Sequence, residues 1–142
     1  MTIKMHQLMI NGIADYSLLL GIYNGKLVSV SFQKIELLLD DNRVSNQFIS
    51  LGLPIRDEDQ KIILQFKNYF KNPAIDWKLN FDWPKRTLFQ CRVLDYLTTI
   101  ALGSTKTYGQ IAKDLHTSAR AVGNACRHNP FPIVIPCHRV VA

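Results

Sequence analysis

A cysteine and a histidine stand side by side in IPCHRVV, residues 135–141, and this pair could perform nucleophilic chemistry. An imidazole can accept the proton of a nearby thiol, and the resulting thiolate is a strong nucleophile. Adjacent residues of a strand point to opposite faces, so Cys137 and His138 need a turn or a bridging water to cooperate. The alternative is that Cys137 is a small buried hydrophobe with no chemical function.

Prolines constrain the path of the chain around this pair. Pro130, Pro132 and Pro136 fall within seven residues, which excludes a helix and predicts a rigid extended segment that holds the thiol in place. The other cysteines, Cys91 and Cys126, form no Cys-x-x-Cys pair. An odd total of three cysteines indicates neither a disulfide framework nor a zinc site. We therefore expect reduced thiols, no metal and no cofactor.

The net positive charge is confined to the second half of the chain. Residues 1–84 carry nine basic and nine acidic side chains, whereas residues 85–142 carry eight basic and two acidic ones. Such a basic domain is typical of proteins that bind nucleic acid, since contacts to phosphate supply most non-specific affinity. A solvated basic face is the alternative. The sequence lacks a signal peptide and a membrane-spanning stretch, so a cytoplasmic protein without membrane contact is expected.

The second half also contains the helices expected to position the cysteine segment. Apolar residues recur at helical spacing between Thr87 and Leu102 and end near Gly103. This apolar stripe comprises Leu88, Phe89, Val93, Leu97, Ile100 and Ala101. Thr107, followed by Gln110 three positions later, predicts a capping box that begins a second helix.

A third helix is predicted over SARAVGNACR, residues 118–127, after a short turn. One of its faces would carry Ala119, Val122, Ala125 and Cys126, and another would carry Arg120 and Arg127. Two short helices across a tight turn in a basic domain predict a helix-turn-helix. A glycine within a helix costs about 1 kcal/mol relative to alanine, so Gly123 would be explained by a partner that approaches this helix closely.

The first half predicts a small α/β or α+β domain without catalytic residues. Asn24-Gly25 between two β-rich runs in residues 16–32 predicts a hairpin with a type I′ turn. Asp57 is a plausible N-cap for a helix that buries Ile62, Ile63, Phe66 and Phe70. Alternating Trp77, Leu79 and Phe81 predict a short strand before Pro84. Residues 34–53 receive no assignment. The predicted domains are 1–84 and 85–142.

Four segments give the chain a resemblance to a known family. They are FQCRV at 89–93, TYGQIA at 107–112, ARAVGNACRHNP at 119–130 and PCHRVV at 136–141. Together they resemble the O6-alkylguanine-DNA alkyltransferases, also called methylated-DNA–protein-cysteine methyltransferases. The resemblance implies an N-terminal α/β (α+β) domain of ribonuclease-H-like topology and a mainly helical helix-turn-helix catalytic domain. It also implies a single-turnover repair protein that flips an O6-alkylguanine out of double-stranded DNA and transfers the alkyl group to its own cysteine.

The resemblance further implies a role for each matching residue. Cys137 would be the nucleophile, His138 the base that activates it through water, and Tyr108 the proton donor to the departing guanine. Arg120 would fill the space of the extruded base, with the recognition helix in the minor groove. Further DNA contacts would come from Tyr108, Ala119, Gly123 and Arg127, and the substrate pocket would include Asn129, Pro136 and Val140.

The sequence ends at Ala142, whereas the family pattern continues with a Gly-Tyr-containing loop over the pocket, a helix and a glutamate that orients the histidine. The catalytic domain is therefore expected to be C-terminally incomplete. Two alternatives to alkyl transfer remain: a catalytically weakened or inactive DNA-lesion-binding protein of the same fold, and a cysteine hydrolase. We expect a monomer located where DNA is, in the nucleoid or nucleus.

Overall fold

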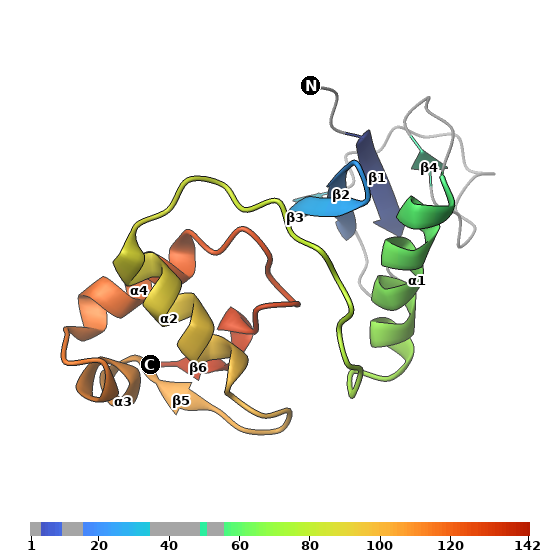
Figure 1. Cartoon of the computed structure of the whole chain (residues 1–142). Coiled ribbons are helices and arrows are strands. Elements are labelled where there is room, and N and C mark those ends of the chain that lie inside the picture. The colour runs from blue at the N-terminus through green and yellow to red at the C-terminus, as the bar shows by residue number, and fades with distance from the viewer. Residues whose placement is uncertain (1–3, 10–15, 35–48, 51–55) are drawn as a thin grey trace. The chain divides into compact units, whose positions relative to one another are not determined.

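The computed structural model describes residues 4–9, 16–34, 49–50 and 56–142. It divides the chain into two compact units, Met1–Asp82 and Trp83–Ala142 (Figure 1). Most of residues 34–53, which the sequence left unassigned, lies outside the described ranges. Within these ranges, every helix is too short or too polar to cross a membrane.

The first unit contains a four-stranded antiparallel sheet and one helix. The strands are β1 (Lys4–Met9), β2 (Tyr16–Tyr23), β3 (Lys26–Lys34) and β4 (Ile49–Ser50), in the order β3-β2-β1-β4. Asn24 and Gly25 join β2 to β3 with φ angles of 47° and 70°, as a type I′ turn requires, so the predicted hairpin is confirmed. Alternate residues of β2, Leu18, Leu20 and Ile22, are fully buried.

Helix α1 (Asp57–Lys71) buries Ile62, Ile63 and Phe66 as predicted, but Phe70 stays 38% exposed. The predicted N-cap is wrong, because Arg56 occupies that position without a side-chain hydrogen bond to the helix. Asp57 instead lies in the first turn, where its negative charge favours the positive end of the helix dipole.

The segment around Trp77 does not form the predicted strand. Its only ladder contact in the described residues is the bridge between Leu27 and Phe81. The Gln65 side chain of α1 satisfies the backbone of Lys78. Its Oε1 accepts from the Lys78 N–H at 2.7 Å, and its Nε2 donates to the Lys78 carbonyl at 3.0 Å. Trp77 itself packs against Phe66 and Tyr69, with ring centroids 4.8 and 5.5 Å away.

The second unit is mainly helical. Its elements are α2 (Leu88–Thr98), β5 (Lys106–Thr107), α3 (Tyr108–Asp114), α4 (Ala119–Arg127), the 3₁₀ helix η1 (Cys137–Arg139) and β6 (Val140–Val141). Helices α3 and α4, with the turn between them, form the predicted helix-turn-helix. The predicted capping box at Thr107 and Gln110 is confirmed by hydrogen bonds of 2.9 and 3.0 Å.

Helix α2 is shorter than predicted. Val93, Leu97 and Ile100 of the predicted stripe are buried, whereas Leu88 is 85% exposed at the first helical position and Ala101 lies exposed beyond the helix. The helix ends at Thr98, and the Thr98 and Thr99 hydroxyls donate to carbonyls of its last turn at 2.6 Å. Its start has a second capping box, Thr87 with Gln90, which the sequence analysis missed.

Helix α4 begins at Ser118, whose Oγ accepts from the Ala121 N–H at 3.2 Å. Val122, Ala125 and Cys126 are buried as predicted, but Ala119 is exposed, because it lies in the first turn outside the buried face. Arg120 and Arg127 are exposed, as predicted. The C-terminal end of α3 is held to α2 by hydrogen bonds from Tyr96 to Asp114 and from Arg92 to the Leu115 carbonyl.

Aromatic packing supports the segment that leads to the cysteine. The Trp83 ring meets the buried Phe131 edge-on, with centroids 4.9 Å apart, and the Arg86 guanidinium carbon lies 3.9 Å from the Trp83 centroid. These contacts connect the start of the second unit to the loop before Cys137.

Candidate active site

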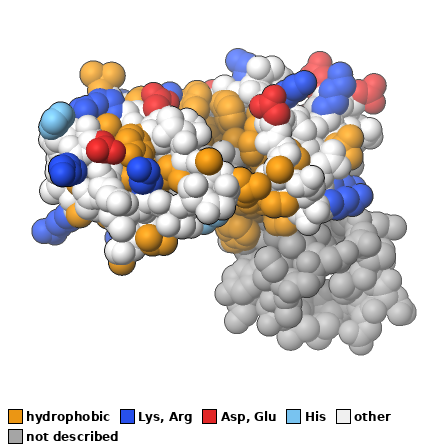
Figure 2. Space-filling view, turned by 90° about the horizontal axis from the view of Figure 1, so that it is seen from below, with side chains coloured by type: hydrophobic (Ala, Val, Ile, Leu, Met, Phe, Trp, Pro, Cys, Tyr) orange, Lys and Arg blue, Asp and Glu red, His pale blue; other side chains and the backbone are white. Residues whose placement is uncertain are grey.

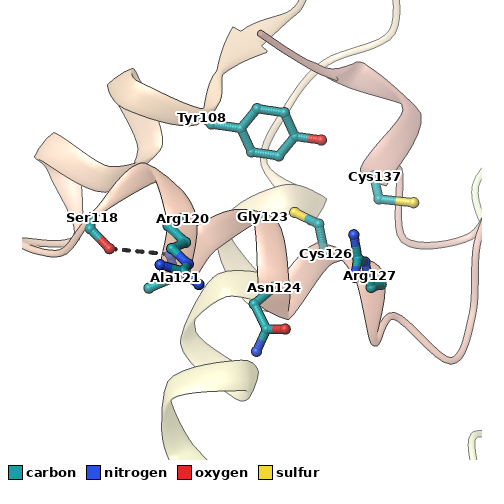
Figure 3. Close-up of a pocket in the computed structure, with 9 residues that line it drawn as sticks. All are labelled: Tyr108, Ser118, Arg120, Ala121, Gly123, Asn124, Cys126, Arg127 and Cys137. Carbon is teal, nitrogen blue, oxygen red and sulfur yellow. Dashed lines mark hydrogen bonds between the residues drawn. The ribbon is translucent and has the colours of Figure 1, made fainter.

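An open groove of about 1010 Å³ lies along α4 in the second unit (Figure 3). Three separate elements supply its walls: the start of α3, the exposed side of α4, and η1. The lining residues are Tyr108, Ser118, Arg120, Ala121, Gly123, Asn124, Cys126, Arg127 and Cys137. Because the groove is open rather than closed, it can receive part of a macromolecule.

A short parallel strand pair brings the two ends of the groove together. Lys106 of β5 pairs with Val140 of β6, and Thr107 pairs with Val141. Tyr108 follows β5 directly and η1 precedes β6 directly, so this pairing fixes Tyr108 and Cys137 on neighbouring chain segments. In Figure 3 the Tyr108 ring lies over α4, with its hydroxyl directed toward the side of the groove that holds Cys137.

The cysteine lies in a turn, so the predicted extended segment is wrong at this point. The Ile135 N–H donates to the Phe131 carbonyl at 2.9 Å, and the Cys137 N–H donates to the Ile135 carbonyl at 2.8 Å. Ile133 lies inside the turn that the first bond closes and has a positive φ of 77°. The prediction that the prolines exclude a helix is also wrong at Cys137, because the 3₁₀ helix η1 begins there, directly after Pro136. The prolines allow tight turns, and one of these presents the thiol.

Two polar side chains anchor this turn to the rest of the unit. Asn129 bridges the loop, because its Nδ2 donates to the Ile135 carbonyl at 2.9 Å while its Oδ1 accepts from the Phe131 N–H at 3.0 Å. Arg139 donates from Nη1 to the Ile100 carbonyl at 2.7 Å, just after the end of α2. The loop is thereby fixed at both sides of Cys137.

His138 follows Cys137 within η1, where neighbouring side chains diverge by about 120° around the helix axis. The imidazole of His138 therefore does not point at the Cys137 thiol, and proton transfer between them requires an intervening water. The His138 side chain is exposed on one side. Burial of the remainder, together with the Arg139 cation, lowers its pKa from the ordinary value of 6.5. At neutral pH the imidazole is therefore unprotonated and can accept a proton.

The three thiols have different environments. Cys126 is a buried residue of the groove lining, where burial and the nearby Cys137 raise its pKa to about 11, so it remains a protonated thiol at neutral pH. Cys91 lies outside the groove and accepts a hydrogen bond from Arg86 Nε at 2.9 Å. Cys137 is part-exposed and lines the groove, which makes it the thiol best placed to react with a bound substrate.

The groove collects some of the residues that the sequence indicated. Of these, Tyr108, Arg120, Gly123, Arg127 and Cys137 line it. The other predicted site residues lie outside the groove lining: His138, Ala119, Asn129, Pro136 and Val140. Of these, Pro136 and Val140 are buried. Sequence reasoning missed Ser118, Ala121, Asn124 and Cys126. Their helical spacing relative to Arg120 and Gly123 was the available signal. Among the described residues, no cluster of three or more His, Cys, Asp or Glu side chains could hold a metal ion.

Glycine at position 123 leaves space in the groove. A Cβ added there would meet the Tyr108 Cδ1 and Cε1 atoms at 3.9 Å, an ordinary van der Waals distance. The packing of α4 against Tyr108 therefore does not require glycine. An external partner that approaches α4 closely would still explain it.

Two comparisons with known proteins identify the family. The model of the 6-O-methylguanine DNA methyltransferase DNA binding domain matches residues 88–142. The methylated-DNA–protein-cysteine methyltransferase of Thermococcus kodakarensis is 35% identical over 130 residues, which cover 85% of this chain and 74% of that relative. The chain belongs to the methylated-DNA–protein-cysteine methyltransferase family.

Other members of this family are also similar to the chain in sequence and structure. The Archaeoglobus fulgidus protein is 32% identical over 105 residues, covering 74% of this chain and 71% of the relative. A crystal structure of Mycobacterium tuberculosis OGT in complex with DNA matches with a TM-score of 0.67 at 27% identity, covering 96% of this chain and 78% of that one. The predicted fold class, a small α/β unit followed by a mainly helical one with a helix-turn-helix, is confirmed.

Proposed function

We propose that this protein repairs double-stranded DNA by transferring a methyl or other alkyl group from O6-alkylguanine to its own Cys137. The observation that carries the proposal is the part-exposed Cys137 thiol in an open groove with Tyr108 and Arg120, in a chain of the methyltransferase family. Each protein molecule would act once, because the thioether of S-alkylcysteine is not hydrolysed in water at neutral pH and the thiol is not regenerated.

The transfer is a displacement at the alkyl carbon. The Cys137 proton passes through a water to His138, and the thiolate sulfur forms a bond to the alkyl carbon as the bond from that carbon to O6 of guanine breaks. The electron pair of the broken bond stays with the guanine, which takes up a proton donated by Tyr108. The products are S-alkylcysteine and an unmodified guanine. The lowered pKa of His138 supports its part, since an unprotonated imidazole can accept the thiol proton.

Duplex DNA would bind along the exposed side of α4. Arg120 and Arg127 are exposed there, and Gly123 leaves room for a close partner. Base flipping is needed because the O6 atom of a stacked guanine is out of reach of Cys137, and Arg120 is the side chain proposed to occupy the vacated space. Ala119 is exposed at the start of α4 and would contact the backbone, with the helix in the minor groove.

The pocket for the flipped base would be shaped by the loop around Cys137. Asn129 holds that loop through its two hydrogen bonds, Pro136 fixes the backbone before the thiol, and the backbone carbonyls of Cys137 and Val140 would accept from the exocyclic amine of guanine. Residues 85–142 would then form the DNA-binding and alkyl-acceptor domain, and residues 1–84 a scaffold.

Binding would depend on electrostatic attraction between the DNA phosphates and the basic second half of the chain. On the face drawn in Figure 2, Lys and Arg side chains are distributed over the surface rather than gathered in one patch. Since residues 85–142 carry eight basic and two acidic side chains, most of the attraction to phosphate would come from this half. We propose a monomer that works in the compartment that holds the DNA.

Lesion binding without transfer is less well supported. A binding protein has no use for a reactive thiol, yet the turn at residues 135–139 presents Cys137 in the groove. The family match to named methyltransferases also supports transfer. A cysteine hydrolase is disfavoured by the same match.

The test is mass spectrometry of the intact protein after incubation with a duplex that contains one O6-methylguanine. The proposal predicts that the protein mass increases by one methylene and that peptide mapping places the methyl group on Cys137. Cys137→Ala should show no mass increase but keep duplex affinity. Cys126→Ala is the matched control and should still be methylated at Cys137. No mass increase with wild-type protein, or a methyl group on Cys91, would refute the proposal.

A further inference from the structure

Asn124 is a groove residue that alkyl transfer does not use. It lies in α4, lines the groove and is exposed. Its backbone carbonyl lies 2.8 Å from His128 Nδ1, but in the part of the chain that the structure describes its side-chain amide has no hydrogen-bond partner. The amide can donate two hydrogen bonds and accept others, so it is available to an external ligand.

The position of Asn124 relative to the two exposed arginines of α4 is specific. Arg120 precedes it by four residues and Arg127 follows it by three, so helical geometry places all three side chains on one face. Figure 3 shows Asn124 between the arginines along the helix. A helix rises about 1.5 Å per residue, so the two arginines are separated by about 10 Å along the axis.

This spacing suits a helix that lies in a groove of duplex DNA. The long Arg127 side chain can reach a phosphate and Arg120 can reach the space of the extruded base, whereas the short amide between them can reach only what lies directly beneath the helix. Beneath a helix in the minor groove are the edges of base pairs, where A·T and T·A pairs present acceptors only and G·C and C·G pairs add the donor of the guanine amine.

The distance from Arg120 indicates which base pairs lie in reach. Four residues of helix span about 6 Å, and stacked base pairs are about 3.4 Å apart. If Arg120 fills the site of the flipped base, Asn124 lies over a pair one or two steps away. We propose that Asn124 contacts the minor-groove edge of a base pair within two steps of the flipped nucleotide and makes the protein distinguish flanking A·T pairs from flanking G·C pairs. This inference rests on the proposed function.

The experiment compares Asn124→Ala with wild-type protein on duplexes that carry O6-methylguanine with each of the four base pairs at the two flanking positions. Alanine favours a helix more than asparagine does, so the variant should fold. Asn68→Ala is the matched control, since Asn68 is an exposed helical asparagine in the first unit. The readouts are the methyl-transfer rate on each duplex and the rate with free O6-benzylguanine, which needs no DNA contact.

We expect wild-type transfer rates to differ by roughly threefold to tenfold between duplexes with A·T and with G·C flanking pairs, the contribution of one hydrogen bond, and to change little between A·T and T·A. Asn124→Ala should reduce this spread to less than twofold and should slow duplex transfer more than the free-base reaction, whereas Asn68→Ala should keep the full spread. An unchanged spread in Asn124→Ala, a wild-type protein without a preference, or an equal loss on free base would each overturn the inference.

A binding measurement separates this inference from the proposed function. Cys137→Ala, with and without Asn124→Ala, is titrated with the same duplexes, and the same loss of preference is expected in the dissociation constants. Failure of wild-type protein to methylate Cys137 would refute the proposed function alone. Equal dissociation constants of Cys137→Ala for duplexes with different flanking pairs would refute the role of Asn124, whatever the outcome of the transfer assay.

Discussion

Replacing Gly123 by alanine should stabilise the folded protein and weaken its binding to DNA. Gly123 lies in the middle of α4, where a glycine costs about 0.5 to 1 kcal/mol relative to alanine. The added methyl group would lie 3.9 Å from the Tyr108 ring, so no steric cost within the protein offsets this gain. The free energy of unfolding should therefore rise by about 0.5 to 1 kcal/mol.

The same methyl group would project into the groove where we place the duplex. A ligand that contacts the helix backbone at Gly123 must then shift, and such overpacking typically costs about 1 kcal/mol or more. Duplex affinity should therefore fall by roughly fivefold or more, since about 1.4 kcal/mol corresponds to a factor of ten. Opposite effects on stability and binding are the signature of a glycine kept for a partner.

The assay is thermal unfolding combined with a duplex titration by fluorescence anisotropy. A midpoint increase of about 2 to 8 °C is expected for a unit of this size. Gly109→Ala is the matched control, because Gly109 lies in α3 outside the groove and its added Cβ would meet only Thr107 Oγ1 at 3.8 Å. This control should be stabilised without losing affinity. A destabilised Gly123→Ala protein, or one that binds DNA as well as wild type, would refute the reasoning.

Three further variants test the site. Arg120→Ala should slow transfer from duplex DNA much more than from free O6-benzylguanine, because only the duplex requires base extrusion; equal losses in the two rate assays would make Arg120 structural. Asn129→Ala removes two part-buried hydrogen bonds and should lower the free energy of unfolding by about 1 to 3 kcal/mol in urea denaturation, and an unchanged midpoint would contradict this. Because the pKa of His138 is lowered in the folded protein, the unfolded chain binds more protons than the folded protein as the pH falls through 6.5. The free energy of unfolding of the wild type should therefore decrease below that pH. His138→Gln should lack that part of the pH dependence, and an identical slope in both proteins would show that His138 does not cause it.

Features set by local chemistry were predictable from the sequence. Asn24 and Gly25 tolerate positive φ, which the hairpin turn requires. The Thr107 and Gln110 side chains cap the first turn of α3. Both features depend only on residues close in sequence. The Thr87 and Gln90 capping box has the same local signature and could have been found in the same way. The apolar spacing of α4 correctly indicated its buried face at Val122, Ala125 and Cys126.

Features set by tertiary contacts were not predictable. Three prolines restrict the backbone near Cys137 without selecting between an extended path and a turn. The turn combines local hydrogen bonds with a distant one from Arg139 to the Ile100 carbonyl, 39 residues away, which the sequence does not reveal. The groove combines three elements, so only the neighbours of known residues on α4 could have been inferred.

The two tryptophans of the chain are distributed one to each compact unit. Trp77 packs against Phe66 and Tyr69 in the first unit, and Trp83 packs against Phe131 in the second. Intrinsic fluorescence therefore contains two separable signals. A Trp77→Phe protein would emit only from the unit that carries Cys137, and a Trp83→Phe protein only from the other. Denaturation of the two proteins, followed by emission, would reveal whether the units melt together or one at a time.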